Sequence, residues 1–265
     1  MPIQKITANG VSFNCAIDGP EGAPWITFSN SLATNISMWD AQIEALKGEY
    51  RMLRYDKRGH GGTEAVEGPY NWDMLVGDVV ALWDELSIEK SHFVGLSMGG
   101  MTAFGLAQDH ADRLLGTVAS NTRADAPPAF RDGWDGRIAT AREKGMAAMA
   151  GPTVERWCSD EFLASGSPTL DKMKEMVAST SVIGFAGCGY ALKELNFQDR
   201  LGEIDTPMLF IGGKEDGATP SENMKLIHQQ VAGSKFMELS PAGHLSNLEQ
   251  PEAYSAALRD YLGAY

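Results

Sequence analysis

The stretch Gly95-Leu96-Ser97-Met98-Gly99-Gly100 decides how this 265-residue chain folds. It follows the apolar run 92–94 and leads into residues 101–107, whose composition predicts a helix. A serine in a Gly-x-Ser-x-Gly frame between a strand and a helix predicts a tight turn that holds the serine hydroxyl above a sheet. Such a turn leaves no room for side chains at Gly95 and Gly99, and the free N–H groups of the helix N-terminus favour developing negative charge. Ser97 is therefore the candidate nucleophile.

Strand and helix patterns alternate on both sides of this stretch. Besides the strand before Ser97, we expect strands at 4–8, 11–17, 25–28, 51–55, 114–119, 207–211 and 235–239. We expect the flanking helices at 39–46, 71–86, 101–107, 221–231 and 247–262. The alternation predicts an α/β fold in which helices cover both faces of a mostly parallel, eight-stranded sheet.

The alternation stops between residues 125 and 196, where the pattern is helical and contains no convincing strand. We interpret residues 125–196 as a helical cap inserted into a core domain made of residues 1–124 and 197–265. Tryptophans and methionines recur through this block, which indicates ordinary packing of the cap, with some of these side chains expected to line a cleft beneath it.

Composition and charge exclude several classes of function. A hydrophobic fraction of 43% with 22% charged residues fits a soluble enzyme, and no apolar run approaches the ~18 residues of a membrane span. The net charge of −13 argues against binding to nucleic acid or to anionic membranes. The beginning of the chain lacks the pattern of a signal peptide, so we expect a cytoplasmic protein. Assembly into a homo-oligomer stays open.

Cys15, Cys158 and Cys188 are too far apart in the sequence for a metal-ligand motif or a disulfide framework. We expect them to be small buried side chains, and we expect no metal site.

A serine hydroxyl needs a general base, and the base needs an acid to orient it. Of the five histidines, His244 is the one that follows both Ser97 and the last expected strand. His60 lies on a loop at the correct edge of the sheet but precedes the serine, which makes it the second candidate. His244 is the predicted base.

The acid is expected after the penultimate strand, where Glu215 and Asp216 are adjacent. Asp216 is favoured because a helix begins shortly after it, and Glu215 is then a solvated loop charge. Asp125 is an alternative, because some enzymes of this architecture carry the acid after an earlier strand.

Hydrolysis of an acyl group also needs two backbone N–H donors for the oxyanion. One is expected from Met98, directly after the nucleophile. The other is expected from the loop after the strand 25–28, with Leu32 favoured over Ala33.

With these residues in place, the chain resembles the 3-oxoadipate enol-lactonases, a family within the α/β-hydrolase superfamily. The elbow around Ser97 and the expected acid and base are typical of the superfamily. The more specific likenesses are Asn30-Ser31-Leu32 and Gly184-Phe185-Ala186-Gly187-Cys188. Other matching stretches are 38–40, 54–56, 58–62, 120–122, 134 with 137–138, 156–157 and 243–251.

The resemblance implies hydrolysis of a small enol-lactone that carries a carboxylate, during breakdown of aromatic compounds, without metal or organic cofactor. Ser97 would attack the lactone carbonyl, His244 would take its proton, and Asp216 would stabilise the imidazolium. Asn30, Trp134 and Arg137 are the expected substrate-binding residues. Arg123 and Arg156 are further candidates for the cation that meets the substrate carboxylate.

Three other functions remain open at this stage. The chain could be a carboxylesterase, or a lactonase for another ring. It could be a catalytically silent receptor, although an intact serine, aspartate and histidine argue against that. A cofactor-free perhydrolase or haloperoxidase shares the same three residues and would require peroxide.

Overall fold

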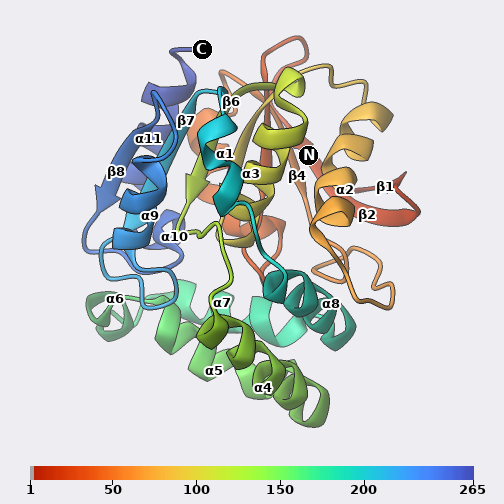
Figure 1. Ribbon diagram of the computed structural model, residues 1–265, viewed down its shortest axis with the longest axis vertical. Helices are drawn as coiled ribbons and strands as arrows, with labels where there is room; N and C mark the ends of the chain where they lie inside the picture. The colour runs from red at the N-terminus through yellow and green to blue at the C-terminus, as the bar shows by residue number, and fades with distance from the viewer. Residues whose placement is uncertain (1–2) are drawn as a thin grey trace.

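The computed structural model describes residues 3–265 as a single sheet with helices on both faces and a group of helices at one edge (Figure 1). The strands are β1 (Gln4–Ala8), β2 (Val11–Asp18), β3 (Trp25–Ser29), β4 (Arg51–Tyr55), β5 (Ser91–Leu96), β6 (Leu114–Ser120), β7 (Met208–Gly213) and β8 (Lys235–Leu239). Their order is β1-β2-β4-β3-β5-β6-β7-β8. Only the pairs β1–β2 and β2–β4 are antiparallel among the described strands. This confirms the predicted fold class.

Neighbouring residues of β3 show how the two faces are covered, because successive side chains on a strand point to opposite sides. The ring of Phe28 packs 5.0 Å from that of Trp39, which immediately precedes α1 (Asp40–Leu46). Thr27 accepts a hydrogen bond of 2.8 Å from the indole of Trp83 in α2 (Trp72–Glu85). Helix α1 packs with α11 (Pro251–Leu262), whereas α2 packs with α3 (Met98–Asp109). The two helix pairs therefore lie on opposite faces of the sheet.

Five α-helices and one 3-10 helix, η3 (Gln198–Glu203), lie between β6 and β7 in the sequence. The five α-helices are α4 (Pro128–Lys144), α5 (Met146–Trp157), α6 (Asp160–Ala164), α7 (Pro168–Ser179) and α8 (Val182–Lys193). Figure 1 shows them gathered at one edge of the sheet, away from the layers of the core. They occupy most of the segment 125–196, in which we expected a helical cap.

The expected helix 247–262 is two helices in the structure, α10 (Ser246–Glu249) and α11. Pro251 is the reason, because proline has no N–H to continue a helix but is suited to a first turn. The expected helix 221–231 is also shorter and is α9 (Ser221–His228). None of the helices described in residues 3–265 is both long enough and apolar enough to cross a membrane.

Candidate active site

The turn around Ser97 has the geometry that the glycines predicted. Ser97 lies between β5 and α3 with φ 55° and ψ −113°, a conformation that costs a residue with a side chain about 1–3 kcal/mol. A Cβ added at Gly95 would overlap the carbonyl of Gly99, and one added at Gly99 would overlap the carbonyl of Ser29. The surrounding structure stabilises this strained backbone conformation. For example, the Ser97 carbonyl accepts a 2.7 Å hydrogen bond from the hydroxyl of Thr122.

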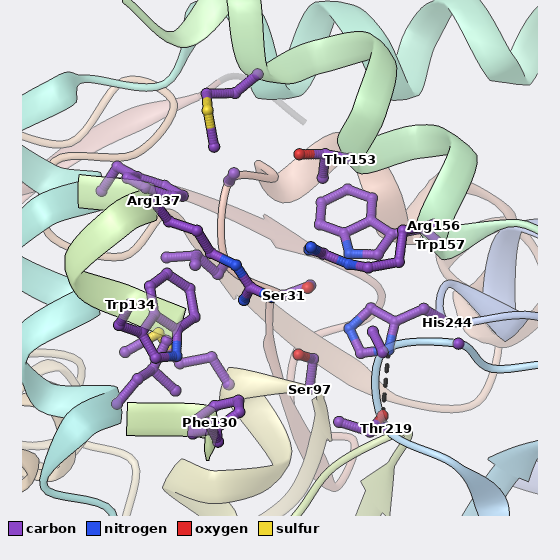
Figure 2. Close-up of a pocket in the computed structure, with 18 of the residues that line it drawn as sticks. Ser31, Ser97, Phe130, Trp134, Arg137, Thr153, Arg156, Trp157, Thr219 and His244 are labelled. Carbon is purple, nitrogen blue, oxygen red and sulfur yellow. Dashed lines mark hydrogen bonds between the residues drawn. The ribbon is translucent and has the colours of Figure 1, made fainter. Parts of the chain in front are cut away.

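Asp216 and His244 lie in direct contact. Asp216 follows β7 and His244 follows β8, and a hydrogen bond of 2.9 Å joins His244 Nδ1 to Asp216 Oδ2. Because strands β5, β7 and β8 run parallel, their carboxyl ends meet at one edge of the sheet. Ser97 and His244 both line one cavity of about 130 Å³ at this edge, and Figure 2 shows them together in it.

The carboxylate of Asp216 is buried and fully supplied with donors. Its Oδ1 accepts from the backbone N–H groups of Ala218 (2.7 Å) and Thr219 (2.9 Å). Its Oδ2 accepts from the Thr219 hydroxyl (2.7 Å) and from the amide of Asn121 (3.0 Å). Burial acts to raise the pKa of Asp216, but the charge and hydrogen bond of His244, together with Thr219, lower it overall. The carboxylate is therefore ionised at neutral pH and fixes the His244 proton on Nδ1.

With its proton on Nδ1, His244 keeps a lone pair on Nε2, which is the arrangement that a general base requires. The ring is held from the cap side by Trp157 of α5, whose ring lies 5.8 Å away at 30°. The backbone N–H of His244 donates to the carbonyl of Trp157 at 2.5 Å. Glu249 adds a second link, since its carboxylate accepts from Gly243 N (3.0 Å) and from the hydroxyl of Ser159 (2.6 Å) at the start of α6. The cap thus helps to hold the ring of His244, the candidate base, in place.

The alternatives to Asp216 and His244 lie elsewhere. His60 is buried outside the cavity and donates from Nδ1 to the carbonyl of Arg58 at 2.9 Å, while burial lowers its pKa to about 4. Glu215 accepts hydrogen bonds from Ser240 and from the backbone of Ala242. Asp125 pairs with Arg123 at 3.4 Å and lies outside the cavity that Ser97 lines.

The residues expected to hold an oxyanion both line the cavity. Met98 is the first residue of α3, and Leu32 lies in the loop after β3. Neither backbone N–H has an acceptor among residues 3–265, as oxyanion donors require. Ala33 also lines the cavity and its N–H is likewise unpaired, so the geometry leaves it as the alternative.

The cap supplies the opposite wall of the cavity. Its apolar lining comes from three cap helices and consists of Phe130, Trp134, Met149, Trp157, Phe185 and Leu192. Trp134 was expected from sequence, and its indole N–H is buried without a hydrogen-bond partner. Trp157 and Phe185 belong to the cap side chains of which some were expected to line a cleft, but neither they nor Phe130 were singled out. No local pattern distinguishes an apolar side chain that faces a cleft from one that fills a core.

Two arginines on the cap also line the cavity, Arg137 on α4 and Arg156 on α5. Within residues 3–265, neither guanidinium has a carboxylate within 4.0 Å or a hydrogen-bond acceptor. Arg137 lies 4.9 Å from the ring of Trp134, and burial with the like charge of Arg156 lowers its pKa to about 10. Both remain charged at neutral pH. Arg123, the third candidate, is committed to Asp125 and to the ring of Phe130.

The structure corrects the expectation for Asn30, which does not line the cavity. Its side chain is fully buried, donates to the carbonyl of Tyr55 (3.1 Å) and accepts from the indole of Trp39 (2.9 Å). Asn30 is the first residue after β3, and its amide turns inward to satisfy these groups. It therefore supports the loop that carries Leu32 and does not line the cavity.

A family model for the alpha/beta hydrolase fold matches residues 24–251, and the chain belongs to this family. It is 37% identical to 3-oxoadipate enol-lactonase 1 of Acinetobacter baylyi, over 92% of this chain and 91% of that protein. Among solved structures it resembles the enol-lactonase of Burkholderia xenovorans LB400, with a TM-score of 0.94, 36% identity, and coverage of 98% and 100%. A thermophilic esterase from Thermogutta terrifontis, solved with malate bound, has a TM-score of 0.93, 27% identity, and coverage of 100% and 99%. The chain is a hydrolytic, ester-cleaving enzyme, as its sequence predicted.

Proposed function

We propose that this protein is a serine hydrolase that opens a small enol-lactone bearing a carboxylate, of the 3-oxoadipate enol-lactone type. The observation that carries the proposal is one cavity in which Ser97 and the His244–Asp216 pair face two arginines. Within residues 3–265 neither arginine has a carboxylate within 4.0 Å, and the charge of Asp216 acts on Arg156 only at longer range. An unpaired cation in a partly dry site is costly to bury, so an anionic ligand is the expected partner. The similarity to enol-lactonases supports the same substrate class.

In the first half of the proposed reaction, Ser97 Oγ attacks the lactone carbonyl carbon while His244 Nε2 takes the hydroxyl proton. Asp216 stabilises the resulting imidazolium through Nδ1. The N–H groups of Met98 and Leu32 hold the negative oxygen of the tetrahedral intermediate. When the intermediate collapses, the ring C–O bond breaks and the enol oxygen leaves, taking up the proton from His244 Nε2, which returns His244 to its neutral form. This is easier than expelling an alkoxide because the enolate is delocalised.

The second half releases the product from an acyl-enzyme. His244 takes a proton from water, and the hydroxide attacks the ester carbonyl on Ser97 through a second tetrahedral intermediate at the same donors. Collapse breaks the bond to Ser97 Oγ, which regains its proton from His244. The product carries the new carboxylate and the carbonyl group formed when the enol tautomerises. None of these steps needs a redox partner.

The substrate carboxylate is assigned to Arg137, with Arg156 as the second cation of the cavity. A guanidinium offers paired N–H donors that match a carboxylate. The overall charge of −13 repels an anion, so local cations are needed to draw one into the cavity.

We further propose that the reaction belongs to the breakdown of aromatic compounds in the cytoplasm. The similarity to enol-lactonases supports a role in the breakdown of aromatic compounds. The three cysteines (Cys15, Cys158 and Cys188) are free thiols. Free thiols are typical of a reducing compartment, which supports the cytoplasmic location.

The proposal is tested by comparing kcat/KM for 3-oxoadipate enol-lactone, a neutral lactone of similar size and p-nitrophenyl acetate. We expect the anionic lactone to be preferred by at least the tenfold that about 1.4 kcal/mol represents. A preference for the neutral substrates would overturn the anionic assignment and would favour a carboxylesterase, or a lactonase for another ring.

A further inference from the structure

Ser31 carries a hydroxyl that the proposed mechanism does not yet use. It lies in the loop after β3, one residue before Leu32, and lines the same cavity as Ser97. The residue is only 1% exposed, and its Oγ has no hydrogen-bond partner among residues 3–265. Leaving a buried hydroxyl unpaired costs about 1–3 kcal/mol, so a partner is expected to arrive with the ligand.

The loop around Ser31 is held in place by bonds that do not involve its hydroxyl. The buried ammonium of Lys57 donates to Ser29 Oγ at 2.9 Å and also to the carbonyl of Asn30. The carbonyl of Ser31 itself accepts from the hydroxyl of Thr34 at 2.8 Å. These contacts fix the backbone on both sides of Ser31, so its hydroxyl is preorganised without the entropy cost of ordering a loop.

The nearby groups determine what this hydroxyl can bind. Figure 2 shows the Ser31 hydroxyl pointing into the cavity that Ser97 faces. The neighbouring N–H groups of Leu32 and Met98 are donors without an acceptor in the described part of the chain, and the arginines of the cavity are donors as well. A group of neighbouring donors is complementary to an oxygen that becomes negative during the reaction.

We propose that Ser31 is a further catalytic residue, whose Oγ–H donates a third hydrogen bond to the oxyanion formed when Ser97 attacks an ester carbonyl. No bond to carbon is made or broken at Ser31, and its proton stays on its oxygen throughout. The proposal rests on acyl transfer at Ser97, but it does not depend on which ester is the natural substrate, since every ester forms the same oxyanion.

The test compares Ser31→Ala with wild type, using p-nitrophenyl acetate and the anionic lactone in parallel. Removing one oxyanion donor costs on the order of 10²–10³-fold in kcat in well-studied hydrolases. We expect kcat to fall by at least about tenfold on both esters with KM nearly constant, because the bond forms only in the transition state. Ser31→Cys keeps a similar side-chain volume but offers a weaker hydrogen-bond donor. Its kcat should therefore lie between those of wild type and Ser31→Ala.

A second readout separates this role from a loss of structure. A trifluoromethyl ketone inhibitor forms a charged tetrahedral adduct with Ser97, so its inhibition constant should rise in Ser31→Ala by the same factor by which kcat falls. Thr117→Val is the matched control, because Thr117 also has a buried hydroxyl without a partner but lies in β6 outside the cavity. It should keep wild-type kcat and inhibition.

The outcomes decide between the proposals. Unchanged kcat in Ser31→Ala, or a rise in KM alone, would overturn the assignment of Ser31 while leaving Ser97 as the nucleophile. A fall in kcat without a parallel weakening of the ketone would overturn it as well. If wild type hydrolyses p-nitrophenyl acetate but not the lactone, the proposed substrate fails and Ser31 is still tested on the acetate.

Discussion

Replacing Arg137 by glutamine removes the half-buried cation that we assign to the substrate carboxylate. The substitution keeps a long polar side chain on α4 and removes no ion pair, because Arg137 has no acidic partner among residues 3–265. Its pKa of about 10 means that wild type binds with a charged guanidinium at pH 7.5. The change therefore tests the charge with little disturbance of the fold.

The size of the effect follows from the environment of the guanidinium. A hydrogen bond to a charged group is worth about 1.5–3 kcal/mol, and the site is neither fully dry nor fully exposed. A loss of about 2–3 kcal/mol corresponds to a fall of roughly 30- to 150-fold in kcat/KM for the anionic lactone. The contact exists before and during the reaction, so the fall should appear mainly as a higher KM.

The assay measures kcat and KM for the anionic lactone and for p-nitrophenyl acetate with wild type and Arg137→Gln. The neutral ester carries no carboxylate and should lose less than about threefold. Arg142→Gln on the same helix is the control, because Arg142 is exposed and lies outside the cavity. Equal losses on both substrates would refute the assigned role, as would an unchanged KM for the lactone.

Two further substitutions test the supporting structure. Asp216→Asn should lower kcat by about 10⁴-fold, as loss of the acid does in serine proteases. Asp125→Asn should retain activity. Equal rates for the two variants would contradict the assignment of Asp216 as the acid. Burial lowers the pKa of Lys57 to about 7, so unfolding takes up a proton between about pH 7 and 10 and stability rises with pH across that window. Lys57→Met should remove this rise, which amounts to at most about 1.4 kcal/mol per pH unit, and urea unfolding at pH 7 and 9 measures it. Parallel profiles for wild type and Lys57→Met would show that Lys57 does not titrate there.

The sequence was sufficient to predict the sheet and the candidate residues at its edge. Gly95 and Gly99 allow only one kind of turn around Ser97, and this is a local property. Asp216 and His244 were found because parallel strands bring their carboxyl ends to one edge, so position after a strand is enough to place a side chain there. Their contact of 2.9 Å follows from topology rather than from any local motif.

The wall supplied by the cap could not be predicted in the same way. Trp157 lies on helix α5, and which face of that helix meets the cavity depends on how it packs against α7 and α4. Trp134, Arg137 and Arg156 were expected only through the family resemblance. For Asn30 the sequence predicted a substrate contact that the structure does not place in the cavity. Its side chain turns inward and satisfies buried groups instead. Ser31, its neighbour, is the residue that faces the cavity, because successive side chains of an extended segment point to different sides.

Labelling with a fluorophosphonate, followed by peptide mass spectrometry, tests the central claim most directly. The reagent reacts only with a serine made nucleophilic by a neighbouring base, so the phosphonyl group should be found on the peptide containing Ser97. Labelling should be abolished in Ser97→Ala and strongly slowed in His244→Ala. A label on another residue, or hydrolysis that survives in Ser97→Ala, would contradict the account.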